Sequence, residues 1–219
     1  NYIPGSGGTW GLLSNPGQYA ISTSPSNTHN HFLNCGDHTT GSGNMFVANG
    51  ADVANTTVWS QTVSVEPNQD YVFSFWAMNA INDAINISQL QLYVNGQPIG
   101  PINTTGGVGC IWSEINDLWN SGTSTQAVLS IVNHSTTGAG NDFAIDDILF
   151  APYCSFQDTI ELSFADHNLQ LNPNHTICEG NTTTLTANVT STTASNFVYH
   201  WNNTTDDVAS QTVSPITQT

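Results

Sequence analysis

Hydrophobic and polar residues alternate along much of this chain, and no window has the period of an amphipathic helix. The clearest alternation runs through residues 58–65, and residues 71–78 form an aromatic stretch typical of a strand. Similar runs predict strands at 18–22, 45–50, 90–94, 97–102, 111–118, 126–133 and 143–151. The polar turn at 66–70 predicts a hairpin between 58–65 and 71–78, and Asn95-Gly96 predicts a hairpin between 90–94 and 97–102.

Short strands separated by Gly, Asn and Pro turns predict an all-β protein. We expect an antiparallel jelly-roll β-sandwich over residues 1–154, in which 1–34 is loop apart from 18–22. A linker or connecting strand is expected at 155–165. A strand bearing Cys178 and a later strand bearing Trp201 then predict an immunoglobulin-like sandwich over 166–219. Because such a domain needs about 100 residues, we expect it to be incomplete at Thr219.

The charge of the chain is strongly one-sided. The 219 residues include 16 acidic ones and no Lys or Arg, which gives a net charge of −16. This composition argues against nucleic-acid binding, which needs basic side chains, and favours divalent cations as partners. Six Trp, six Tyr and nine Phe indicate a folded protein. No apolar run is long enough to predict membrane insertion, and no cationic segment opens the chain, so we expect any signal peptide to have been removed.

The four cysteines, at positions 35, 110, 154 and 178, include no Cys-x-x-Cys pair and have no histidines at zinc spacing. In a polar extracellular chain they predict two disulfides, for which three connectivities exist. We favour Cys35 with Cys110 and Cys154 with Cys178, because nearer pairs close shorter loops. The expected location is extracellular or on a cell surface.

The segment 35–44 collects oxygen ligands and glycines in one turn. Asp37 is followed by hydroxyl residues, by glycines whose backbone carbonyls can turn inward, and by Asn44. Such oxygens suit calcium, although Asp37 can instead cap its own backbone in an Asx turn. The adjacent Asp146 and Asp147 favour the cation, because neighbours on a strand face opposite sides and a buried carboxylate has no Lys or Arg to pair with here. The sequence therefore predicts a structural calcium ion.

Two motifs resemble a known group of modules. Residues 37–45 and 141–148 together resemble the paired signatures of MAM-type and carbohydrate-binding-module-like jelly rolls. The resemblance is strongest to the modules of large secreted surface proteins of Bacteroidetes-type bacteria, including gliding and adhesin proteins. Residues 176–180 and 199–201 resemble the immunoglobulin-like repeats that follow such modules.

The resemblance implies a calcium ion held between the loop and the last strand of the jelly roll. Asp37 and either Asp146 or Asp147 match the ligand positions of the family. The shell would be completed by the residues that follow Asp37 in the loop, namely Asn44 and the carbonyls of Thr39 or Gly41.

The resemblance also bears on covalent modification. The resemblance implies that some relatives carry cysteines where this chain has Ser60 and Ser130, so these serines would mark a bridge that this protein lacks. Residues 158–160 resemble the O-glycosylation sequon of the same bacterial group, which would place a glycan on Thr159.

Aromatic side chains are the candidate ligand platform. Trp76 and Met78 share one face of their strand, and the aromatic residues at 71, 73 and 75 share the other, so one face is core. Trp76, Tyr93 and Trp119 are candidates for stacking on sugar rings. The alternative is that all three are core residues of the sandwich.

The leading functional hypothesis is a non-enzymatic extracellular module for adhesion or recognition in a large bacterial surface protein, stabilised by calcium and binding surface glycans or another extracellular protein. Glu66, Glu114, Glu161 and Glu179 have no recognisable catalytic setting, so we expect no enzyme. The first alternative is a self-assembling structural subunit of an extracellular filament or sheath. The second is a substrate-targeting module of a secreted polysaccharide-degrading enzyme.

Overall fold

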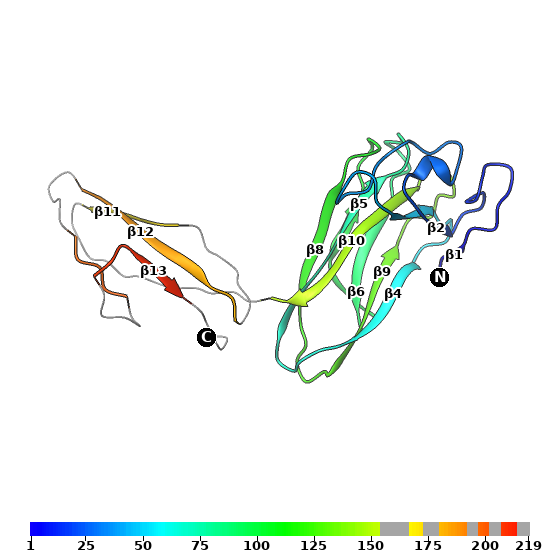
Figure 1. Ribbon diagram of the computed structural model, residues 1–219. Coiled ribbons are helices and arrows are strands. Elements are labelled where there is room, and N and C mark those ends of the chain that lie inside the picture. The colour runs from blue at the N-terminus through cyan, green and yellow to red at the C-terminus, as the bar shows by residue number, and fades with distance from the viewer. Residues whose placement is uncertain (154–166, 173–179, 192–196, 202–206, 214–219) are drawn as a thin grey trace. The chain divides into compact units, whose positions relative to one another are not determined.

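The computed structural model describes residues 1–153, 167–172, 180–191, 197–201 and 207–213 (Figure 1). It divides into two compact units, Asn1–Ala151 and Pro152–Thr219. Apart from one 3-10 turn, η1 (Pro25–Asn27), its regular elements are strands, so the predicted all-β class is confirmed. Among the described residues, no helix has the length and apolar character that a membrane span requires.

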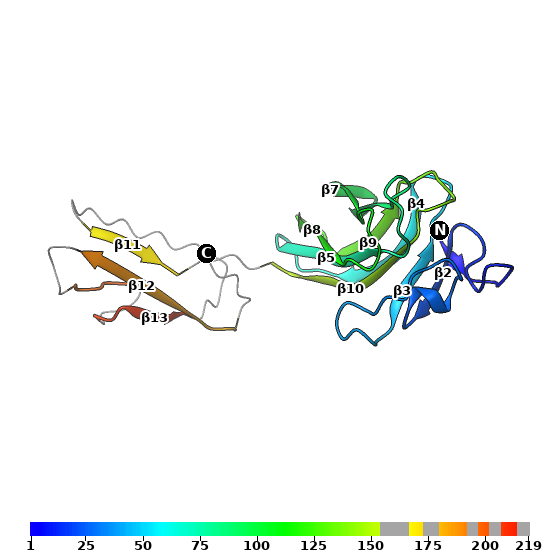
Figure 2. The same ribbon diagram turned by 90° about the horizontal axis from the view of Figure 1, so that it is seen from above.

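The first unit is a sandwich of two sheets, whose strands lie in two layers (Figure 2). One sheet has six strands in the order β1-β2-β3-β10-β5-β8, and the other has four in the order β4-β9-β6-β7. The strands are β1 (Ile3–Pro4), β2 (Gln18–Ser22), β3 (Met45–Asn49), β4 (Thr56–Ser64), β5 (Asp70–Asn79), β6 (Gln89–Val94), β7 (Gln97–Thr104), β8 (Ser113–Asn120), β9 (Gln126–Asn133) and β10 (Phe143–Pro152).

The main core lies between the two sheets. Alternate residues of β5 contribute Phe73 and Phe75, and β6 and β9 contribute Leu92 and Leu129 from the opposite sheet. Each of these four side chains is almost completely buried. Burial of a large apolar side chain stabilises the fold by roughly 2 kcal/mol, so this layer contributes strongly to the stability of the first unit.

One of the two predicted hairpins is confirmed and the other is wrong. β6 and β7 pair through Val94 and Gln97, and the positive φ angles of Asn95 (53°) and Gly96 (76°) suit the tight turn between them. β4 and β5 do not pair with each other, because β4 pairs with β9 while β5 pairs with β8. The segment 65–69 carries the chain from one sheet to the other, as in a jelly roll.

A second core covers the other face of the six-stranded sheet. Met45, Val47 and Met78 point away from the main core and pack with Leu13 and Phe32 of the N-terminal segment. Residues 1–34 contain few regular elements, as expected, but they bury this face. β5 is therefore buried on both sides around Met78, which explains why its sequence is apolar almost throughout.

A disulfide joins Cys35 to Cys110 at a Cα–Cα distance of 5.3 Å, which confirms the favoured pairing for these two cysteines. It ties the N-terminal segment to the loop before β8. The second predicted bridge, between Cys154 and Cys178, lies outside the described residues, and so does Thr159.

The described residues of the second unit form one antiparallel sheet of three strands, β11 (His167–Leu171), β12 (Thr183–Ser191) and β13 (Ser210–Val213). The strand predicted at 197–201 is absent from this described part. The backbone of residues 197–201 makes a hydrogen bond to a side chain instead, since the Tyr199 N–H donates to the Asp207 carboxylate. Trp201 is nevertheless buried, and its indole N–H donates to the Val208 carbonyl at 2.9 Å.

Candidate ligand-binding cleft

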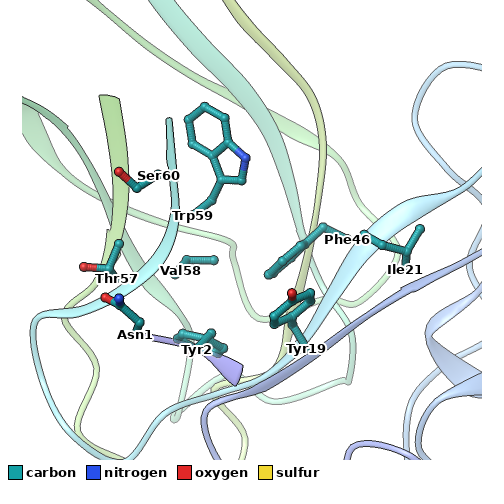
Figure 3. Close-up of a pocket in the computed structure, with 9 residues that line it drawn as sticks. All are labelled: Asn1, Tyr2, Tyr19, Ile21, Phe46, Thr57, Val58, Trp59 and Ser60. Atoms are coloured by element: carbon teal, nitrogen blue, oxygen red, sulfur yellow. The ribbon is translucent and has the colours of Figure 1, made fainter. Parts of the chain in front are cut away.

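A cleft of about 490 Å³ opens in the first unit where β2 and β3 of one sheet face β4 of the other (Figure 3). Aromatic rings dominate its wall. Tyr19 and Phe46 stand on one side and Trp59 on the other. The nine lining residues are Asn1, Tyr2, Tyr19, Ile21, Phe46, Thr57, Val58, Trp59 and Ser60.

Strand register places the first wall of the cleft. Tyr19 pairs with Ala48 and Ile21 pairs with Phe46, so the side chains of Tyr19, Ile21 and Phe46 share one face of the six-stranded sheet. The Tyr19 and Phe46 rings stack with centroids 4.9 Å apart and planes 13° from parallel. The pair is half-buried, so it forms a fixed apolar surface that solvent still reaches.

An irregularity in β4 forms the opposite wall. The register with β9 shifts between Thr57 and Trp59, which leaves Val58 as an extra residue in β4. Trp59 then packs against Phe73 of the core at a centroid distance of 6.4 Å, while part of its ring remains exposed to the cleft. Tyr2 closes one end, because its backbone N–H donates to the Thr57 carbonyl at 2.9 Å.

The polar side chains of the cleft are all uncharged. Within the described part of the chain, no hydrogen bond occupies the Tyr19 hydroxyl or the Trp59 indole N–H. The Ser60 hydroxyl donates to the Leu129 carbonyl at 2.8 Å and lies 3.1 Å from the Ser130 hydroxyl, which leaves it one lone pair for a further donor. The wall thus offers two donors beside flat apolar rings.

Tyr2 also lines the cleft, but its hydroxyl makes its hydrogen bonds within the protein. Its hydroxyl accepts from the Ala51 N–H at 2.8 Å and from the Asn133 side-chain amide at 2.9 Å. Burial raises the pKa of Tyr2 to about 12, despite the opposing effect of these hydrogen bonds. Tyr2 therefore holds the N-terminal segment against the sandwich.

The three residues predicted to bind glycans lie in separate surroundings. Trp76 stacks on His38 with centroids 3.8 Å apart, and Tyr93 stacks on His134 at 6.0 Å. Trp119 packs against the main core beside Tyr71, at 6.1 Å. None of the three lines the cleft, and no ring contact joins any two of them within the described residues. Their predicted role in glycan binding stays a prediction.

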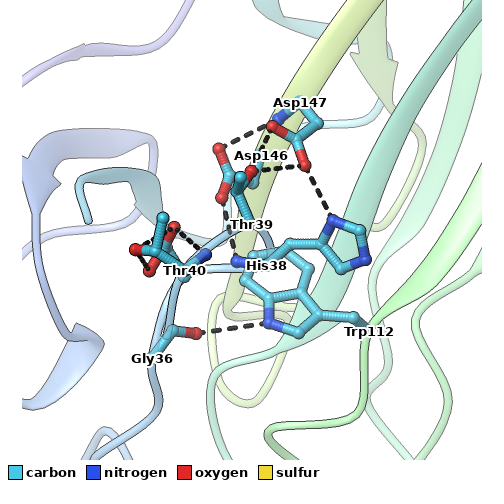
Figure 4. A network of polar contacts seen from close by, with 8 residues as sticks. Gly36, His38, Thr39, Thr40, Trp112, Asp146 and Asp147 are labelled. Carbon is cyan, nitrogen blue, oxygen red and sulfur yellow. Dashed lines mark hydrogen bonds and ion pairs between the residues drawn. The ribbon is translucent and has the colours of Figure 1, made fainter. Parts of the chain in front are cut away.

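The predicted loop and the predicted acidic pair do lie together (Figure 4). The His38 N–H donates to the Asp146 carboxylate at 2.9 Å, and the His38 ring contacts the Asp147 carboxylate at 2.7 Å. The Thr39 hydroxyl donates to Asp147 at 2.7 Å. The His38 hydrogen bond, followed by that of Thr39, lowers the pKa of Asp147.

Asp37 caps its own loop. Its carboxylate accepts from the Thr40 N–H at 3.0 Å, from the Gly43 N–H at 2.6 Å and from the Thr40 hydroxyl at 2.9 Å. Burial raises the pKa of Asp37, but these hydrogen bonds together outweigh that effect and hold it below its ordinary value. A Cβ on Gly43 would lie 2.8 Å from this carboxylate, which explains the glycine there. The arrangement corresponds to the Asx-turn alternative.

These oxygens do not form a calcium shell in this arrangement. The carboxylates of Asp37, Asp146 and Asp147 accept hydrogen bonds from protein donors, and the Thr39 hydroxyl is itself one of those donors. Gly41 and Asn44 lie exposed in the loop. In the part of the chain that the structure describes, no three His, Cys, Asp or Glu side chains gather as metal ligands would. The residues as placed do not fit the ion, and calcium stays a prediction from the sequence.

Sequence reasoning missed the three cleft aromatics. Tyr19, Phe46 and Trp59 each occur in a predicted strand, where an aromatic residue indicates core in the first instance. The only local signal is the adjacent apolar pair Val58-Trp59, which departs from strict alternation at the start of the run 58–65. Finding the cleft requires knowing that β4 lies opposite β2 and β3, which no local pattern reveals.

Comparison with known proteins yields distant matches of fold. No family model matches the chain, and no curated protein matches it. A solved sugar-binding protein, the EclA C-terminal domain, is 19% identical over 45% of this chain and 68% of its own, with a TM-score of 0.41. The CBM22-1 xylan-binding domain from Paenibacillus barcinonensis is 14% identical over 67% of this chain and 88% of its own, with a TM-score of 0.40.

A family 35 carbohydrate-binding module from Clostridium thermocellum is 15% identical over 62% of this chain and 92% of its own, with a TM-score of 0.38. These matches are distant likenesses of structure between this chain and sugar-binding or carbohydrate-binding modules. Similarity at this level says nothing about what this chain binds. The finer resemblance to bacterial gliding and adhesin proteins stays a prediction.

Proposed function

We propose that the first unit is a non-catalytic glycan-binding module whose ligand lies in the aromatic cleft. The observation that carries this proposal is the pairing of the stacked Tyr19 and Phe46 rings with Trp59 across a cavity of about 490 Å³. A volume of this size is within the usual range for small-molecule sites.

The chemistry of the wall suits a sugar. One face of a pyranose ring carries mostly C–H groups, which stack on aromatic faces, while its hydroxyls need donors and acceptors at the edge. The Tyr19 hydroxyl and the Trp59 indole N–H supply such groups beside the rings. A fixed apolar surface with a few polar groups is the common design of ligand sites.

The cleft supports binding without hydrolysis. Glycoside hydrolysis uses two carboxyl groups facing each other across the bond to be cleaved. None of the nine residues that line this cleft is Asp or Glu. We therefore propose that the module binds its glycan and does not cut it.

We further propose that this binding serves adhesion or recognition outside the cell. The Cys35–Cys110 disulfide supports an oxidising location, since such bonds persist outside the cytosol. The role in a large bacterial surface protein rests on sequence resemblance. A filament subunit and a targeting module of a polysaccharide-degrading enzyme stay alternatives, and glycan binding without self-association would favour recognition or targeting over the filament.

A glycan array probed with the 219-residue chain tests the proposal. We expect binding that Trp59→Ala or Tyr19→Ala weakens by about tenfold or more, because each removes a stacking surface. Trp10→Ala is the matched control, since Trp10 is 45% exposed and lies outside the cleft. Melting curves of each variant establish that it is folded. Absence of binding to any glycan, or equal losses in the Trp10 and Trp59 variants, would contradict the proposal.

A further inference from the structure

We infer that the cleft selects neutral glycans and rejects anionic ones such as polyuronates and sulfated chains. The inference rests on the proposed function and specifies the class of ligand. It follows from the charge of the cleft wall, from the charge of the whole chain and from the positions of the histidines.

No side chain of the wall carries a positive charge that could pair with an anion. All nine lining residues are Asn, Tyr, Ile, Phe, Thr, Val, Trp or Ser. Carboxylates and sulfates are held in proteins chiefly by Arg and Lys, whose charge-assisted hydrogen bonds offset the loss of hydration. The 219 residues contain neither Arg nor Lys, so none of them can supply such a bond.

Histidine does not replace the missing cations in the cleft. In the first unit His29 and His31 contact Trp10, with ring centroids 6.5 and 4.9 Å from it. His38 contacts Asp147, and His134 contacts Tyr93. None of these four lines the cleft, so none of them supplies a cation there.

A bridging metal ion does not replace the missing cationic side chains either. A divalent cation that linked the wall to a uronate would need hard, preferably charged, oxygen ligands from the protein. The wall contributes only hydroxyl, amide and carbonyl oxygens and no carboxylate. The acidic side chains around the loop at Asp37 belong to a different set of residues from those of the cleft.

The net charge of −16 acts in the same direction over longer distances. An acidic polysaccharide that approaches this chain is repelled, most strongly at low ionic strength. A neutral glycan meets no such barrier. Its affinity is therefore expected to be nearly independent of salt, whereas any residual binding of an acidic glycan should increase with salt.

The test compares neutral and acidic oligosaccharides of similar length on the full chain by calorimetry. Xylo-, cello- and laminari-oligosaccharides are the neutral probes, and oligogalacturonate and alginate oligomers are the acidic ones, each measured in EDTA and in calcium. We expect the best neutral probe to bind at least about tenfold more tightly than any acidic probe. Its affinity should change by less than about twofold between low and high salt.

A charge introduced into the wall gives a second test. Thr57→Lys places an ammonium group in the cleft, and we expect it to increase affinity for oligogalacturonate by about tenfold. Thr62→Lys is the matched control, because Thr62 lies exposed on the same strand outside the cleft and adds the same net charge.

The outcomes separate the two claims. Tighter binding of an acidic probe by the unmodified chain would overturn the inference while leaving glycan binding in place. Equal gains from Thr57→Lys and Thr62→Lys would also overturn it, because the effect would then come from net charge alone. Failure of every neutral and acidic probe to bind would overturn the proposed function itself.

Discussion

Asp142 is a buried carboxyl group in the first unit. Its side chain accepts from the Gly50 N–H at 2.9 Å, and the residue is 9% exposed. Burial raises the pKa of Asp142 to about 6; the Gly50 hydrogen bond opposes this effect, and the nearby charge of Asp83 adds to it. The charge of Asp142 in turn contributes to the raised pKa of Tyr2. The ionised form is therefore unfavourable in the folded state.

The first prediction concerns the pH dependence of stability. The pKa of Asp142 is higher in the folded state than in the unfolded state. Its favourable contribution to the free energy of unfolding is therefore fully present below about pH 4 and is lost as pH rises through 6. Asp142→Asn keeps the oxygen that accepts from Gly50 and removes the charge. We expect this variant to be more stable than the parent by about 2 kcal/mol at pH 8 and to lose the advantage at pH 4. Urea unfolding at both pH values measures this, and a variant that is equally stable or less stable at pH 8 would contradict it.

The second prediction concerns the Asp37 cap. The Thr40 and Gly43 donors that Asp37 satisfies belong to the loop itself, so its contribution does not require a metal. Asp37→Ala should lower the melting temperature in EDTA as well as in calcium. If EDTA also lowers the melting temperature of the parent, the calcium predicted from the sequence contributes in addition; an unchanged parent curve rejects calcium. A melting temperature of Asp37→Ala equal to that of the parent in EDTA would refute the role of the cap.

Strand β4 shows how pairing in the sheet brings distant residues together. Ser60 and Ser130 are direct partners in the antiparallel ladder of β4 and β9, and their hydroxyl oxygens lie 3.1 Å apart. These are the two positions at which the sequence resemblance implies a cysteine bridge in relatives. Directly opposed residues on neighbouring antiparallel strands have the closest Cβ atoms of the sheet, so the geometry suits such a bridge.

The third prediction follows from this pairing. The double variant Ser60→Cys/Ser130→Cys should form a disulfide on oxidation and raise the free energy of unfolding by roughly 2–4 kcal/mol, since the bridge would close a loop of about 70 residues. Peptide mapping under non-reducing conditions detects the bond, and melting curves with and without reductant measure its effect. Each single cysteine variant is a control. Free thiols in the oxidised double variant would show that the ladder register is different.

The crossing from β4 to β5 shows the limit of local turn signals. Glu66-Pro67-Asn68 resembles a hairpin turn in sequence, yet the strands on either side belong to different sheets. Asn49-Gly50 likewise follows a strand without making a hairpin, and β3 pairs with β2 and β10 instead. A Cβ on Gly50 would lie 1.9 Å from the Asn141 carbonyl, so the glycine there permits close approach of two chain segments.

The whole molecule carries a large excess of negative charge, because 16 acidic residues have no Lys or Arg to balance them. Like charges on a compact chain repel one another, and unfolding relieves this repulsion. Added salt shortens the screening length from about 30 Å at 0.01 M to about 8 Å at 0.15 M. The folded state should therefore gain stability over this range.

The fourth prediction is that the melting temperature rises when sodium chloride is raised from about 0.01 to 0.15 M at pH 7. The same titration near pH 4 is the control, since protonation of carboxylates reduces the repulsion and should shrink the effect. Differential scanning calorimetry measures both series. A melting temperature that falls with salt at pH 7 would mean that attractive ion pairs outweigh the repulsion.

Several features follow from the sequence by itself, because they depend on residues close together in the chain or on composition. The strand pattern of the first unit, the β6–β7 hairpin with its Asn95-Gly96 turn and the lack of anion-binding side chains all belong to this group. The contact of the loop at Asp37 with Asp146 and Asp147 is also predictable, although it joins distant segments, because the two motifs resemble signatures that occur as a pair.

The features that only the tertiary structure decides depend on contacts between segments that are distant in the sequence. The chain crosses from one sheet to the other between β4 and β5, so these two strands do not pair. The N-terminal segment buries the outer face of the six-stranded sheet around Met78. The cleft is the clearest case, since Tyr19, Phe46 and Trp59 come from three strands and face one another only because β4 lies opposite β2 and β3. Each ring is compatible with an ordinary core position in its own strand, so tertiary packing alone brings these three rings together in one cleft.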